Sequence, residues 1–108
     1  MDEKLAIYGR ELEEAMRRAG IPGHMHGAIK HWVLYGVAGG SFLTYVLQNK
    51  LVEACGRADD ININHIKNYA DLLYNDLPME CWGSLEKAES WAEQGGLNGR
   101  WNQGETVI

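Results

Sequence analysis

A glycine-rich break that runs directly into an apolar segment with helical spacing limits the folds open to this chain more than any other feature. The break spans residues 36–40, and the apolar segment continues to about Arg57. The apolar positions recur every three or four residues, which is the period of an α-helix with one buried face. They are Leu43, Val46, Leu47, Leu51, Ala54 and Cys55. We therefore expect a helix over residues 41–57 at the centre of the fold.

Four further segments have the same helical spacing. They are residues 2–19, residues 26–35, the stretch between Asp60 and Pro78, and residues 84–93. Asp59, Asp60 and Ser84 are suited to cap helix N-termini, and the glycines that follow several of these segments are suited to end them. No stretch of four or more residues alternates between apolar and polar as a strand would. The sequence predicts an all-α chain.

The short connections between these helices favour a compact antiparallel bundle of four to five short helices. We expect one helical domain over residues 1–96, followed by a polar, mobile tail over residues 97–108. A chain of 108 residues leaves much apolar surface near solvent, which self-association into a homo-oligomer would cover.

Composition excludes several functional classes. The formal net charge is −5, whereas dedicated nucleic-acid-binding proteins cluster lysine and arginine on one face. The apolar runs are too short for a membrane-spanning helix, so we expect no membrane partner. Two distant cysteines and the lack of a leader pattern at the start predict a cytoplasmic protein rather than a secreted disulfide framework.

Residues that could carry catalysis or bind a metal are sparse and poorly spaced. His24, His26 and His31 match no common zinc pattern, and Cys55 and Cys81 form no Cys-x-x-Cys pair. Neither cysteine has an evident base and orienting residue nearby in the sequence. We expect no metal, no cofactor and no enzymatic activity.

One motif offers a direct physical route to ligand binding. Gly39, Gly40 and Ser41 form a junction of small residues at a helix N-terminus, where free N–H groups favour an anion. Close helix packing explains the same glycines about equally well. If an anion binds, we expect the remaining site residues to come from neighbouring hydrogen-bond donors and from tryptophans that can stack on a base. They are His31, Tyr35, Lys50 and Arg57, with Trp32 and Trp82.

A second dense group of residues surrounds the predicted helix end at Pro78. Two tyrosines, an asparagine and a tryptophan lie within residues 69–84, in a chain that has four tryptophans and five tyrosines but one phenylalanine. Such residues could line a pocket or join two subunits. A dimer interface is the better explanation on a small chain.

Part of the sequence resembles a group of small uncharacterised proteins encoded by tailed phages and prophages. The resemblance covers roughly His26 to Gly96. The residues that carry it are residues 39–43, residues 46–54, Arg57-Ala58-Asp59, Leu73-Tyr74-Asn75 to Pro78, and Trp82-Gly83-Ser84. The chain departs from the group at Val37 or Ala38, where relatives often have proline, and at Lys50, where they have an acidic residue. The resemblance implies a genetic context rather than a mechanism.

That context leads to two hypotheses. Small phage accessory proteins are often noncatalytic inhibitors, so the first is a binding protein that counters host defence by sequestering a nucleotide-like molecule in the cytoplasm of the infected cell. The second is an inhibitor of a host defence protein that presents its acidic first helix, with Glu11, Glu13 and Glu14, to a basic surface.

Overall fold

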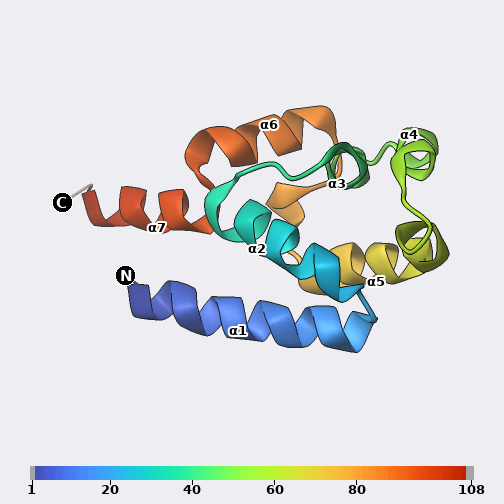
Figure 1. Cartoon of the computed structure of the whole chain (residues 1–108). Coiled ribbons are helices and arrows are strands. Elements are labelled where there is room, and N and C mark those ends of the chain that lie inside the picture. The colour runs from blue at the N-terminus through green and yellow to red at the C-terminus, as the bar shows by residue number, and fades with distance from the viewer. Residues whose placement is uncertain (1, 107–108) are drawn as a thin grey trace.

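Helices make up the fold of the part of the chain that the computed structural model describes, residues 2–106, and no strand is found there. The α-helices, labelled in Figure 1, are α1 (Asp2–Ala19), α2 (His26–Tyr35), α3 (Ser41–Leu47), α4 (Leu51–Arg57), α5 (Ile66–Asp76), α6 (Leu85–Gln94) and α7 (Gly96–Thr106). Short 3-10 helices, η1 (Gly23–Met25), η2 (Asn62–His65) and η3 (Met79–Cys81), precede α2, α5 and α6. The predicted all-α class is confirmed.

Several local sequence signals have their predicted effect. The bounds of α1 and α2 are those expected from the apolar spacing. Gly36 and Gly95 follow α2 and α6 in the left-handed conformation, with φ of 70° and 80°. Ser84 caps α6, because its Oγ accepts a hydrogen bond from the Lys87 N–H at 3.1 Å. Asp59 Oδ1 accepts one from the Asn62 N–H at 2.6 Å, at the start of η2.

The prediction of one long helix over residues 41–57 is wrong, because the helix is interrupted between Leu47 and Leu51. Asn49 has φ of 64°, a left-handed conformation that asparagine adopts more readily than most residues. The Lys50 N–H then donates to the Tyr45 carbonyl at 2.9 Å, which closes the end of α3. The apolar spacing continues through this turn, so it gives no sign of the break. The result is two helices of seven residues each.

The segment expected to be a polar tail after Gly96 starts instead with α7. Leu97 is buried in the core, and the Trp101 ring packs edge-on against Tyr8 with 6.2 Å between ring centroids. Gly96 has φ of 65° and lies against the backbone of Gly36. Helical structure therefore continues beyond residue 96, and the domain boundary stays a prediction. The mobility of residues 97–108 stays a prediction, and residues 107–108 lie outside the described part of the chain.

The helices surround one apolar core. In Figure 1, α1 lies along one side beside α2 and α5, α6 covers the opposite side, and α3 and α4 lie at the end away from the two termini. Two buried tryptophans hold the centre together, because Trp91 Nε1 donates to the Trp32 carbonyl and Trp32 Nε1 donates to the Cys81 carbonyl, each at 2.9 Å. These bonds join α6, α2 and η3.

Candidate anion-binding groove

The glycine junction predicted to bind an anion is exposed at the loop that leads into α3. A Cβ on Gly39 would lie 3.1 Å from the Cβ of Ala28 in α2, so this glycine permits the loop to pack closely on that helix. The Gly40 carbonyl accepts hydrogen bonds from the N–H and the hydroxyl of Thr44. The surroundings of Gly39 thus favour the packing explanation of this motif.

Three other predicted site residues form no hydrogen bond or ring contact with Gly39, Gly40 or Ser41 in the part of the chain that the structure describes. Trp32 is buried in the core. Trp82 is half-buried, and its Nε1 is a buried atom that has no hydrogen-bond partner in the described residues. Arg57 is exposed at the end of α4. Within residues 2–106, no hydrogen bond, ion pair or ring contact joins Arg57 or Trp82 to Ser41 and its neighbouring glycines.

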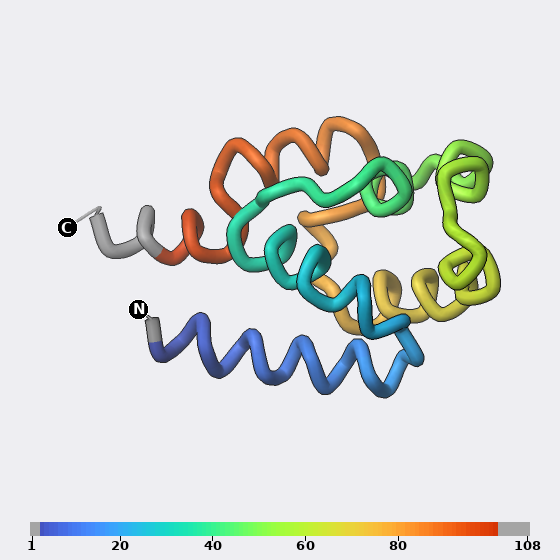
Figure 2. The backbone as a smooth tube through the Cα atoms, viewed as in Figure 1, coloured from blue at the N-terminus to red at the C-terminus, as the bar shows by residue number. Residues whose placement is uncertain are grey.

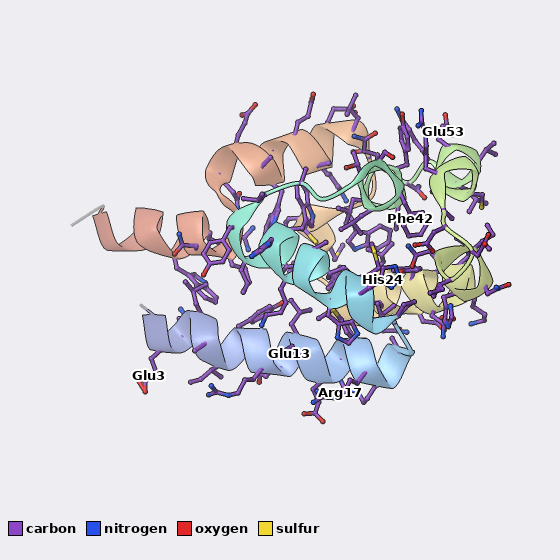
Figure 3. All side chains as sticks on the ribbon, viewed as in Figure 1. Glu3, Glu13, Arg17, His24, Phe42 and Glu53 are labelled. Atoms are coloured by element: carbon purple, nitrogen blue, oxygen red, sulfur yellow. The ribbon has the colours of Figure 1, made fainter. Side chains whose placement is uncertain are left out.

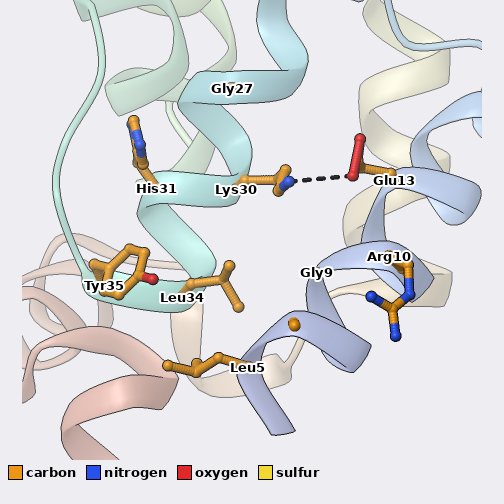
Figure 4. Close-up of a pocket in the computed structure, with 10 residues that line it drawn as sticks. Leu5, Gly9, Arg10, Glu13, Gly27, Lys30, His31, Leu34 and Tyr35 are labelled. Atoms are coloured by element: carbon orange, nitrogen blue, oxygen red, sulfur yellow. Dashed lines mark hydrogen bonds and ion pairs between the residues drawn. The ribbon is translucent and has the colours of Figure 1, made fainter. Parts of the chain in front are cut away.

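His31 and Tyr35, by contrast, line a groove between α1 and α2. Its volume is about 560 Å³, within the range of roughly 300–1,000 Å³ that small-molecule pockets occupy. Figure 4 shows its lining side chains, which come from both helices. They are Leu5, Ala6, Gly9, Arg10 and Glu13 from α1, and Gly27, Lys30, His31, Leu34 and Tyr35 from α2.

The groove has an apolar floor and a partly cationic rim. Leu5 and Leu34 are buried. Lys30 Nζ donates to Glu13 Oε2 across the groove at 3.1 Å, as the dashed line in Figure 4 marks. Arg10 is exposed and forms no ion pair within the described residues. Two permanent cations and one carboxylate therefore line this groove, which makes it locally positive in a chain of net charge −5.

Two planar side chains lie at one end of the groove. The rings of His31 and Tyr35 are tilted by 53°, with centroids 6.4 Å apart, and both residues are exposed. They follow each other at positions i and i+4 on the same side of α2, so a ligand at this end of the groove can contact both rings.

Sequence reasoning missed Arg10 and Lys30 because they belong to different helices whose packing no local pattern reveals. The sequence contains one weaker indication of the groove, which is the presence of glycines within α1 and α2. Gly9 and Gly27 lie within helices, where glycine costs about 1 kcal/mol relative to alanine. A side chain at Gly27 would meet nothing within 4 Å, and one at Gly9 would make ordinary contacts with Leu34 and Lys30. Both glycines leave the groove open.

His24 and His26, which lie outside the groove, have structural partners. His24 Nε2 lies 3.1 Å from Asp59 Oδ2, and His26 Nε2 lies 2.9 Å from the Ile21 carbonyl oxygen. Burial raises the pKa of the Cys81 thiol to about 12, so this side chain stays protonated and a poor nucleophile. The described residues include no cluster of three or more His, Cys, Asp or Glu side chains placed to hold a metal ion.

Comparison of the chain with models of protein families, with characterised proteins and with solved structures gave no match. Among the described helices, none has the length and apolarity needed to cross a membrane.

Proposed function

We propose that this protein is a noncatalytic binding protein that sequesters a small nucleotide-like anion in the groove between α1 and α2. The observation that carries the proposal is the position of Arg10, an arginine without an ion-pair partner among the described residues, on the rim of a groove that also contains Lys30 and His31. Arginine binds phosphate with paired hydrogen bonds, and a locally positive concave surface concentrates anions.

Each part of the groove has a role in this proposal. Arg10 and Lys30 bind the phosphate, with Glu13 orienting the Lys30 ammonium group. His31 and Tyr35 offer ring faces to the base, and the apolar floor of Leu5 and Leu34 excludes water beneath it. The aromatic part of the ligand explains why the site combines charge with planar side chains.

The resemblance to phage-encoded proteins gives this binding activity a context. We propose that the protein acts in the cytoplasm of the infected host cell, as a homo-oligomer, by removing a signalling nucleotide on which host defence depends. Sequestration of this kind requires tight binding and no chemical reaction.

The alternative is an inhibitor that presents an acidic helix to a host protein. Charge pairing on α1 argues against it, because paired glutamates present less negative charge to a partner. Glu13 is paired with Lys30, and Glu14 with Arg17 at 3.5 Å. Arg10 precedes the three glutamates, and Arg17 and Arg18 follow them. Figure 3 shows the Arg17 side chain directed away from the body of the protein. The exposed surface of α1 is therefore mixed in charge rather than acidic.

Isothermal titration calorimetry with ATP, AMP, a cyclic dinucleotide and inorganic phosphate tests the proposal. We expect at least one nucleotide to bind more tightly than phosphate alone, and Arg10→Ala to weaken that binding by about tenfold or more, since a charge-assisted hydrogen bond contributes about 1.5–3 kcal/mol. Arg17→Ala is the matched control, because Arg17 is an exposed cation on the same helix outside the groove. Equal losses in both variants, or no binding of any nucleotide, would contradict the proposal.

A further inference from the structure

Helix α4 exposes apolar side chains that the other described residues leave uncovered. Of its seven residues only Ala54 is buried, while Leu51 and Val52 are 63% and 80% exposed. An apolar crevice of about 110 Å³ runs beside them, between α4 and α5, and Leu51, Ala54, Ile66 and Leu73 are among its lining residues. In Figure 1, α4 lies at the end of the molecule far from both termini. A partner that packs on Leu51, Val52 and the crevice would remove this apolar surface from water.

The charges on α4 indicate which partner fits that surface. Glu53 and Arg57 are one helical turn apart, and within the described residues neither forms an ion pair. Figure 3 shows Glu53 on α4 at the edge of the molecule. A helix with an acid near its start and a base near its end is complementary to an antiparallel copy of itself.

We infer that α4 packs antiparallel against α4 of a second copy of this chain, about a two-fold axis close to Cys55. In this arrangement Glu53 faces the partner's Arg57, and Arg57 faces the partner's Glu53. Val52 packs over the partner's Gly56, where a Cβ would meet nothing within 4 Å in its own chain and where glycine lets two helices approach closely. Leu51 closes over the crevice beside α5.

This inference deepens the homo-oligomer included in the proposed function, but it rests on different residues from ligand binding. The α4 surface shares no residue with the groove between α1 and α2. A wild-type protein that is monomeric but binds nucleotide would contradict the inference alone. A wild-type protein that is dimeric but binds no nucleotide would contradict nucleotide binding alone.

Sedimentation velocity of the full chain, with charge-reversal variants, tests the inference. The wild-type protein should sediment as a dimer. Glu53→Arg and Arg57→Glu each place like charges opposite one another at two symmetric positions, so each should raise the dimer dissociation constant by about tenfold or more. The double variant Glu53→Arg/Arg57→Glu exchanges the charges and should restore the wild-type dissociation constant. A wild-type monomer at every concentration, or a double variant no better than the singles, would overturn the inference.

Two further variants locate the surface and its axis. Val52→Glu should give a monomer with an unchanged circular dichroism spectrum, whereas Ile7→Glu, at an exposed aliphatic residue of α1, should stay dimeric. A short bismaleimide should cross-link the wild-type dimer through Cys55 and should fail with Cys55→Ser, because Cys81 is buried. A dimer that survives Val52→Glu, or that is not cross-linked through Cys55, would overturn the proposed arrangement.

Discussion

At the scale of single residues, Asp59 connects two loops that are distant in the sequence. Its carboxylate accepts the Asn62 N–H at 2.6 Å and lies 3.1 Å from His24 Nε2. Asn62 is itself buried, and its side-chain oxygen accepts the hydroxyl of Tyr69 at 2.5 Å. Asp59 therefore closes the turn that leads into η2, the segment that carries the one buried polar side chain among the described residues.

The Asp59 carboxylate predicts a loss of stability in acid. The Asn62 N–H, followed by His24, lowers the pKa of this carboxyl from its usual 3.8. A lowered pKa means that the folded state binds the proton less well than the unfolded state, so the stabilisation is present above pH 4 and is lost as the pH falls through the folded-state pKa. In Asp59→Asn, the urea midpoint should fall less than in the wild type between pH 6 and about pH 3.

Asp60→Asn is the matched control for this measurement, because it removes the same charge one residue away. The Asp60 carboxylate forms no hydrogen bond with the other described residues, and only its backbone carbonyl accepts one, from Asn64. Its pH dependence should equal that of the wild type. Identical pH dependence in the two variants would assign the effect to net charge rather than to the hydrogen bonds of Asp59.

At the scale of helices, local signals predicted ends and caps well but not every break. Ser84 and Gly36 act through their own backbone geometry, so the sequence reveals them directly. The turn at Asn49 was missed because the apolar spacing continues on both sides of it. Helix α7 was missed because its glycine-rich sequence is a poor helix former, and burial of Leu97 against the other helices outweighs that propensity.

The candidate site was predicted less completely than the fold. His31 and Tyr35 are both at the groove. Trp32 was expected to stack on a ligand, but helical spacing cannot separate an aromatic residue that faces the core from one that faces a pocket. Arg10 comes close to α2 only through the packing of α1 on that helix, which is a long-range contact that no sequence spacing reports.

The contact between α2 and α7 depends on two glycines. A Cβ on Gly96 would lie 2.6 Å from the backbone nitrogens of Gly36 and Tyr35, and the φ of 65° disfavours any other residue. Gly96→Ala should therefore lower the free energy of unfolding by about 2–4 kcal/mol, measured by urea denaturation. Gly40→Ala, where a Cβ meets nothing within 4 Å and φ is −71°, should change it by less than about 1 kcal/mol. Equal effects would contradict the close packing of Gly96.

At the scale of the whole molecule, helix α7 near the C-terminus packs against the start of α1. Figure 2 shows both termini at the same end of the molecule. Trp101 of α7 packs edge-on against Tyr8, and Lys4 Nζ lies 4.5 Å from the centre of the Trp101 ring. These contacts hold the first two turns of α1. Leu5, Ala6 and Gly9 in the same turns line the groove, so α7 helps to hold one wall of the candidate site.

Trp101→Ala tests this dependence. Loss of the edge-on ring contact and the cation–π contact should lower the free energy of local opening of α1 by about 1–2 kcal/mol. Amide exchange in the first turns of α1 should therefore become about tenfold faster. Hydrogen–deuterium exchange measures this directly. Tyr74→Ala, at an aromatic side chain that is 83% exposed, should leave the exchange unchanged. If the groove binds nucleotide, its affinity should fall in Trp101→Ala although Trp101 does not line the groove. Unchanged exchange in α1 would mean that the groove wall is rigid without α7.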